Sequence, residues 1–326
     1  MEKVNKLISV VIPVYNREAL ITEALNSVFD QSYRPLEVIV IDDGSTDRTP
    51  EVVKGWIKVH SSTDGFRVKL VRQEHKGGNP ARNRGIEESR GKYVAFLDSD
   101  DLWLKEKLAK QILCFQDPEV GAVYCGIQPM DLTTGEVSPA IPQAYPRGWI
   151  LARLLVRDVT APTSAFVLRR SVFDVVGRFD EALEARQDWD MWIRVSTAFK
   201  IDAVPEPLVR YRHHSGTRTA SDPYREIRAY NAIRKKYMDL VSRQPFLVRR
   251  AAAASYYKRL GRVHFHHFNS RSRALAYYLL SLANFPADFD TWAAVMGIFL
   301  PEKFRRQAHA LWNGVFGGTR LEIRSH

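Results

Sequence analysis

The chain has 326 residues, enough for one large domain or for one medium domain with an appendage. Its composition, 45% apolar and 26% charged, is typical of a folded soluble protein. The two cysteines, Cys114 and Cys125, lack metal-binding spacing, so we expect no disulfide framework and a reducing compartment. No run of 18 apolar residues occurs, and the first eight residues lack the apolar core of a signal peptide. We therefore expect a cytoplasmic protein, or one that lies on a membrane without crossing it.

The net charge of +11 is concentrated in the last third of the chain. Residues 1–217 hold 29 Lys and Arg against 30 Asp and Glu, whereas residues 218–326 hold 19 against 7. A uniformly basic chain would suggest a nucleic acid partner. This division indicates instead a near-neutral catalytic domain, residues 1–217, followed by a basic tail, residues 218–326, and no nucleic acid partner is expected.

Strand and helix patterns alternate through the first part of the sequence. Short, β-branched runs predict strands at 67–73 and 92–97, and strands that are each closed by a polar turn within 8–16 and 36–47. Helical patterns lie between these runs, at 17–31, from about Pro50, and within the segment GGNPARNRGIEES. This alternation predicts an α/β fold with a mainly parallel, twisted sheet and helices on both faces.

A second part of the chain shows no strand pattern. Residues 187–199 predict a helix rich in tryptophan, and beyond YRHHSGT (211–217) the rest of the chain is expected to be helical. The segments AAAASYYKRLGRVHFHHF and RALAYYLLSLANFP are expected to form an antiparallel helix pair. We place the domain boundary near residue 217.

Polar clusters follow the predicted strands at their carboxyl ends, in the sequences PVYN, DDGSTD and DSDD. In parallel sheets, ligands bind outside these ends. The last cluster places Asp98, Asp100 and Asp101 within four positions, where each charge disfavours ionisation of the others. A hard divalent ion, Mg²⁺ or Mn²⁺, would offset them and bridge phosphate oxygens. Alternatively, Asp100 or Asp101 caps a helix that begins near Leu102, which explains one carboxylate but not three.

Two further acidic pairs are candidates for a site. Asp42 and Asp43 can accept hydrogen bonds from a base N–H or a ribose hydroxyl, or they can form an ordinary turn. Asp188 and Asp190 lie two positions apart, so on a helix they face different directions and cannot form one paired site. Either acid also suits a helix N-terminus without any catalytic role.

The order of the motifs PVYN, DDGSTD, ARNRGI, FLDSDD, QDWDMW and YRHH resembles that of the family 2 glycosyltransferases of GT-A fold. The resemblance covers residues 7 to about 217. It implies an inverting enzyme that takes a sugar from a nucleotide diphosphate donor. The donor-binding positions that it implies are Pro13, Val14, Tyr15, Asp42, Asp43, Arg82, Asp98 and Ser99.

The same resemblance assigns the metal ligands and the base. Asp100 would be the main ligand of Mn²⁺ or Mg²⁺, with Asp98 nearer the ribose and diphosphate and His214 completing the shell. Asp188 matches the catalytic acid of the family and would act as general base on the acceptor hydroxyl. Gln187 departs from the usual acidic residue before it, which removes one neighbouring negative charge.

The resemblance favours a UDP-sugar donor, with thymidine and guanosine donors left open. The acceptor would be a glycan or a lipid-linked molecule in the assembly of a cell-surface polysaccharide, lipopolysaccharide or glycolipid. Its pocket would come from residues 126–162 and the tail. Alternatives are a sugar-nucleotide-binding protein without transfer activity and a nucleotidyltransferase, although IPVYNREA lacks the glycine-rich phosphate loop of that class. The basic tail would suit an anionic membrane surface, or would only pack on the catalytic domain.

Overall fold

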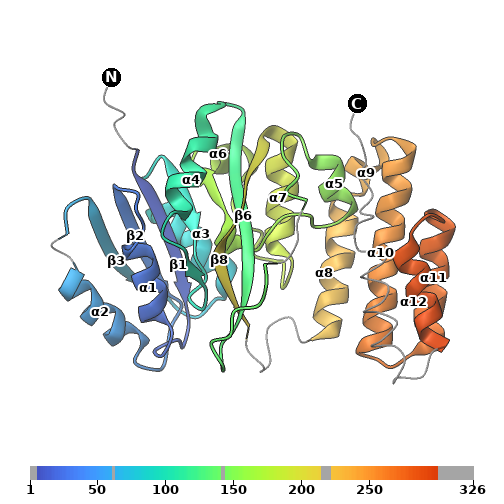
Figure 1. The fold of residues 1–326 in the computed structure, drawn as a ribbon, viewed down its shortest axis with the longest axis horizontal. Helices are drawn as coiled ribbons and strands as arrows, with labels where there is room; N and C mark the ends of the chain where they lie inside the picture. The colour runs from blue at the N-terminus through green and yellow to red at the C-terminus, as the bar shows by residue number, and fades with distance from the viewer. Residues whose placement is uncertain (1–5, 61–62, 141–143, 214–221, 300–326) are drawn as a thin grey trace. The chain divides into compact units, whose positions relative to one another are not determined.

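The computed structural model describes residues 6–60, 63–140, 144–213 and 222–299. Two compact units divide the chain: Met1–Leu151 with Val159–Thr219, and Ala152–Asp158 with Ala220–His326. Among the described residues, Figure 1 shows a sheet with helices on both sides in the first unit and helices without strands in the second. The expected boundary near residue 217 lies outside the described residues.

The first unit is built on one sheet of eight strands in the order β3-β2-β1-β4-β7-β6-β8-β5. Its strands are β1 (Ile8–Val14), β2 (Leu36–Asp42), β3 (Phe66–Arg72), β4 (Tyr93–Phe96), β5 (Leu102–Trp103), β6 (Val120–Asp131), β7 (Val167–Arg169) and β8 (Lys200–His213). Its helices are α1 (Ile21–Phe29), α2 (Thr49–His60), α3 (Gly78–Glu88), α4 (Lys107–Leu113), α6 (Val172–Val176) and α7 (Gln187–Ala198). The predicted α/β fold with helices on both faces is confirmed.

The strands β1 to β4 are parallel to one another, as the alternating pattern predicts. The apolar runs of β1, β2 and β4 are buried because helices cover both faces of such a sheet. Beyond β4 the sheet is mixed, since β7 runs antiparallel to β4 and β6, and β5 runs antiparallel to β8. The parallel half places the ends of β1, β2 and β4 at one edge.

Helix α3 lies very close to the sheet at Gly85. A Cβ atom at this position would stand 2.2 Å from Cγ1 of Val11 on β1, so only glycine fits there. Arg82 lies one turn earlier on the same helix. The close approach therefore fixes the height of Arg82 above the sheet edge.

The expectation of a helix beginning near Leu102 is wrong. Leu102 and Trp103 form β5 and pair with Arg210 and Val209 of β8, and the next helix, α4, begins only at Lys107. Strand β8 itself contains Pro205 and Pro207. Register shifts in its pairing with β6 accommodate these prolines, because a bulge tolerates a residue without an N–H donor.

The second unit is helical, as predicted. Its helices are α8 (Pro223–Lys236), α9 (Met238–Ser242), α10 (Phe246–His266), α11 (Arg271–Asn284) and α12 (Phe289–Phe299), together with most of α5 (Leu151–Val156). Arg250 lies near the start of α10 and donates to the carbonyl oxygen of Asn284 at the end of α11, at 2.6 Å, so the predicted antiparallel pair is confirmed. None of the described helices is long and apolar enough to cross a membrane.

A nearly buried ion pair joins α10 to the start of α12. The Lys258 ammonium lies 3.0 Å from both carboxylate oxygens of Asp288, and the Thr291 hydroxyl donates to the same carboxylate at 2.7 Å. Burial would raise the pKa of Asp288, but the Lys258 charge and the Thr291 hydroxyl outweigh it and hold that pKa below its ordinary value. A carboxyl with a lowered pKa stabilises the folded state above its unfolded-state pKa.

We expect Asp288→Asn to lower the free energy of unfolding by about 3 kcal/mol near neutral pH, because Lys258 then keeps only the exposed Asp290 carboxylate, at 3.4 Å, as its counter-charge. The difference from wild type should shrink as the pH falls through the lowered pKa, below about 4. Urea unfolding across this pH range measures it. Asp239→Asn is the matched control, because the Asp239–Arg243 pair is exposed. A loss that does not change with pH, or that equals the control, would contradict the assignment.

Candidate active site

The loops that follow β1 and β2 are joined directly. The backbone N–H of Asp43 donates to the carbonyl oxygen of Val14 at 2.9 Å, and the N–H of Asn16 donates to the Ser45 hydroxyl at 3.0 Å. Pro13 is half-buried and Val14 is buried at the end of β1. The structure thus brings PVYN and DDGSTD together at one edge of the sheet.

An aromatic pair stands at the surface of this edge. Tyr15 is 38% exposed and its ring stacks on the His75 imidazole, with centroids 4.0 Å apart. His75 Nδ1 lies 2.9 Å from Oδ2 of Asp43, which fixes the imidazole in place. The sequence motifs did not identify His75, because its partners lie about 30 and 60 positions earlier in the chain.

Asp42 and Asp43 are both buried and bind groups of this chain. Asp43 accepts hydrogen bonds from the Gln73 side-chain amide and from the Gly77 backbone N–H, each at 2.7 Å. Asp42 forms an ion pair with Arg72 at 3.1 Å. In the structure these carboxylates hold the segment that leads into α3.

The carboxylates of DSDD do not share one environment. Asp98 forms an ion pair with Arg82, with Nη2 2.5 Å from Oδ1, and its side chain is 29% exposed. Asp100 is half-buried, Ser99 is buried, and Asp101 is almost completely buried. Arg82 itself lies on α3.

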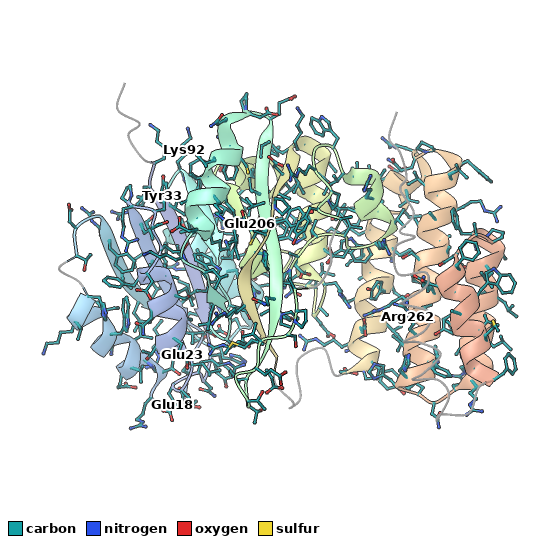
Figure 2. The ribbon with its side chains drawn as sticks, in the orientation of Figure 1. Glu18, Glu23, Tyr33, Lys92, Glu206 and Arg262 are labelled. Atoms are coloured by element: carbon teal, nitrogen blue, oxygen red, sulfur yellow. The ribbon has the colours of Figure 1, made fainter. Side chains whose placement is uncertain are left out.

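Asp101 belongs to a group that we call the loop anchor, formed by Asp101, Ser164 and Arg212. The Ser164 hydroxyl donates to Asp101 at 2.6 Å and accepts the backbone N–H of Asp98 at 3.1 Å. The Arg212 backbone N–H donates to Asp101 at 3.1 Å, and its guanidinium donates to the Asp100 carbonyl oxygen at 2.5 Å. That guanidinium also pairs at 2.6 Å with Glu23 on α1, a residue that Figure 2 labels. The loop anchor therefore fixes the backbone on which Asp98 and Asp100 stand.

Burial of Asp101 raises its pKa well above the ordinary value, and the charges of Asp98 and Asp100 raise it further. Hydrogen bonds from Ser164 and Arg212 act in the opposite direction. The sequence patterns placed Asp101 in the acidic cluster or at a helix cap, and they indicated no role for Ser164 or Arg212. Nothing in the local sequence around a serine or an arginine indicates a hydrogen bond to a residue that is 63 or 111 positions away in the chain.

Asp188 and Asp190 face different directions, as their spacing predicts. Asp190 is fully buried and binds the Arg194 guanidinium at 2.9 and 3.0 Å, within α7. Asp188 is half-buried in the first turn of α7, and its Oδ1 accepts the backbone N–H of Trp189 at 2.8 Å. The charges of Arg82 and Asp98 both act on the Asp188 carboxyl.

The pKa of Asp188 lies above the ordinary value. Loss of solvation by burial is the largest cause, and the Asp98 charge acts in the same direction. The Trp189 N–H and the charges of Arg186 and Arg82 offset part of this increase. A carboxylate with a raised pKa, next to other charged groups, is a candidate general base.

Helix α3 connects these elements. Asn79 donates to the carbonyl oxygen of Leu183 at 3.0 Å. Asn83 donates to the carbonyl oxygen of Phe179 at 2.9 Å and accepts the Phe179 N–H at 2.9 Å. These bonds hold the segment before α7, while Arg82 holds Asp98. Helix α3 thus positions the Asp98 carboxylate relative to the Asp188 carboxylate of α7.

The residues at DSDD fit a hard divalent cation. Asp98 and Asp100 offer carboxylate oxygens, which Mg²⁺ and Mn²⁺ prefer, and neither side chain is fully buried. His214, the third expected ligand, lies outside the described residues. Within the described ranges, no three His, Cys, Asp or Glu side chains are gathered closely enough to hold a metal among themselves.

The sequence is similar to several glycosyltransferases. An uncharacterized glycosyltransferase of Rickettsia conorii is 30% identical over 233 residues, which cover 66% of this chain and 34% of the relative. The chain thus matches about a third of the length of that protein. The Bacillus subtilis protein TuaG, whose name assigns it to teichuronic acid biosynthesis, is 42% identical over 107 residues, 32% of this chain and 40% of TuaG.

Two solved structures share the fold. The mannosyltransferase PcManGT from Pyrobaculum calidifontis, in complex with GDP-Man and Mn²⁺, has a TM-score of 0.59 at 21% identity, covering 96% of this chain and 88% of its own. S. aureus TarS 1–349, in complex with UDP-GlcNAc, has a TM-score of 0.54 at 19% identity, covering 92% and 91%. The family model described as Glycosyl transferase family 2 matches residues 9–177, more than half of the chain. The chain therefore belongs to glycosyl transferase family 2, and it has a GT-A-type fold.

Proposed function

We propose that the protein is a metal-dependent, inverting transferase that moves a sugar from a nucleotide diphosphate, UDP in the first place, to an acceptor hydroxyl. The observation that carries this proposal is that the Arg82 guanidinium pairs with Asp98, while the charges of both residues also act on Asp188 at the start of α7. The UDP-GlcNAc complex of TarS supports a uridine donor, and the GDP-Man complex of PcManGT makes guanosine the second candidate.

The acceptor that we propose is a growing cell-surface polysaccharide, lipopolysaccharide or glycolipid, used on the cytoplasmic side of the membrane. The name of TuaG, which assigns that relative to teichuronic acid biosynthesis, supports a polysaccharide. The cysteines Cys114 and Cys125 are both free, which suits a reducing compartment.

In this proposal the nucleoside lies at the joined ends of β1 and β2. The stacked rings of Tyr15 and His75 present an aromatic face to the base, beside Pro13 and Val14. Asp43, with Asp42 behind it, fixes His75 and the turn toward α3, and so sets the shape of the pocket. The ribose and diphosphate extend toward Ser99 and Asp98.

Asp98 and Asp100, with His214, would hold the divalent cation. When bound, such an ion offsets the charge that develops on the departing diphosphate. Arg82 holds one oxygen of Asp98, so the direction of that carboxylate is set before any ligand arrives. The loop anchor keeps the Asp98 and Asp100 backbone at a constant position, which favours a preorganised site.

Asp188 would accept the proton of the acceptor hydroxyl as that oxygen attacks the anomeric carbon. Because its pKa is raised, the carboxylate is a stronger base than an ordinary aspartate. Attack from the face opposite the diphosphate inverts the anomeric centre in one displacement. No second carboxylate nucleophile is required.

Asp188→Asn should lower the transfer rate by ~10²–10⁴-fold, because an amide keeps the shape but cannot accept the proton. Affinity for UDP should stay near that of wild type. In wild type, kcat should rise with pH through a pKa above about 4, and this dependence should disappear in the variant. Asp190→Asn is the control, and it should reduce thermal stability more than rate. Normal turnover in Asp188→Asn, with a loss in Asp190→Asn, would exchange the two roles.

Asp100→Ala should abolish the increase in Tm that UDP with Mn²⁺ produces, because the main ligand of the cation is removed. Thermal shift with UDP alone, Mn²⁺ alone and both together separates the contributions. If the variant responds to UDP and Mn²⁺ as wild type does, the metal assignment is wrong.

Ser164→Ala should raise the KM for the metal and donor, because the backbone of Asp98 loses one hydrogen bond and Asp101 another. Leaving a buried acceptor without a partner costs about 1–3 kcal/mol, so Tm should fall as well. Ser164→Thr retains the hydroxyl and should restore the KM. An unchanged KM in Ser164→Ala would show that the loop anchor serves stability only.

A further inference from the structure

Helix α12 of the second unit is apolar on two of its faces. Its buried face, with Thr291 and Ile298, packs against a cluster that includes Ala274 and Tyr278 of α11. Four large apolar side chains of the same short helix are exposed, by 58%, 45%, 63% and 70%: Phe289, Trp292, Met296 and Phe299. We call these four residues the α12 stripe.

The α12 stripe is continuous along the helix. Its members are separated by three, four and three positions, so at 3.6 residues per turn they fall within an arc of about 80°. The Trp292 indole N–H donates to the carbonyl oxygen of Pro286 at 2.8 Å, which orients the ring. Large apolar groups that are gathered on one exposed face of a helix indicate a binding surface.

The same unit carries a surplus of positive charge. Residues 222–299 contain 13 Lys and Arg against 5 Asp and Glu. Each of the five acids already forms an ion pair with a Lys or Arg of this unit: Asp222, Glu226, Asp239, Asp288 and Asp290. Residues 222–299 therefore carry a formal net charge of +8, which favours an anionic partner.

We propose that the α12 stripe inserts into the interface of an anionic lipid bilayer. Exposed aromatic and Met side chains on a helix, within a basic unit, meet the two requirements of interfacial binding, buried apolar area and attraction to anionic lipids. Each Lys or Arg near such a surface strengthens binding, in a way that salt weakens. A second copy of this chain fits the stripe less well, because it would bring the same positive charge.

This inference rests on the proposed function only for its purpose, which is to present a lipid-linked acceptor to the enzyme. Binding to vesicles requires no donor, metal or acceptor. A failure of the transferase proposal would therefore be seen in the UDP and Mn²⁺ thermal shift, and a failure of the membrane proposal in vesicle binding.

The test is flotation of the full chain with phosphatidylcholine vesicles, with and without phosphatidylglycerol. Wild type should float only with the anionic vesicles, and high salt should reduce the bound fraction. Trp292→Gln combined with Phe299→Gln should lower the partition coefficient at least tenfold. The control is Phe246→Gln with Leu247→Gln, two residues of α10 that are also exposed, at 60% and 66%, and it should bind like wild type.

Several results would overturn the proposal. The proposal is wrong if wild type floats equally well with neutral and anionic vesicles, or if Trp292→Gln combined with Phe299→Gln binds anionic vesicles like wild type. A large fall in Tm of the stripe variant without altered flotation would mean that the stripe packs inside the chain. Conversion of a dimer to a monomer in light scattering, with flotation unaltered, would assign the stripe to self-association.

Discussion

The ion pair between Arg82 and Asp98 is the interaction on which the active site depends. Carboxylates placed at the ends of neighbouring strands repel one another, and each disfavours the ionised form of the next. Arg82 is buried and contributes one positive charge that acts on Asp98 by direct contact and on Asp188 through space. This charge allows an acidic site to exist at the sheet edge before a divalent cation is bound.

The position of Arg82 is in turn set by packing. Gly85 lets α3 lie against β1, and Asn79 and Asn83 attach the same helix to the segment that precedes α7. A shift of α3 would therefore move Arg82 relative to both Asp98 and Asp188. Helix α3 therefore sets both the position of the Arg82 charge and the positions of Asp98 and Asp188 around it. This explains how two carboxylates that are far apart in the sequence can have different roles in one site.

Much of this arrangement could be predicted from the sequence. The β-branched runs and the amphipathic spacing identified β1 to β4, α1 and α7, because these elements depend on local periodicity. The spacing of Asp188 and Asp190 predicted their divergence for the same reason. The helix expected at Leu102 was wrong because β5 forms only by pairing with β8, more than a hundred positions later.

The parts that could not be predicted are long-range polar contacts. Ser164 and Arg212 support the acidic loop from distant segments, and His75 depends on contact with Tyr15. Periodicity carries no information about such pairs. The three carboxylates of the acidic cluster were expected to be offset by one cation, whereas burial and hydrogen bonding assign Asp101 to the loop anchor.

The most direct test of the account is the pH dependence of kcat in Arg82→Met, with Arg82→Lys as the variant that keeps the charge. Since the Arg82 charge lowers the pKa of Asp188, its removal should move the acidic limb of the profile to higher pH. Arg82→Lys should leave the limb near its wild-type position. An acidic limb that stays in place in Arg82→Met, with transfer still measurable, would contradict the claim that this guanidinium sets the charge balance of the site.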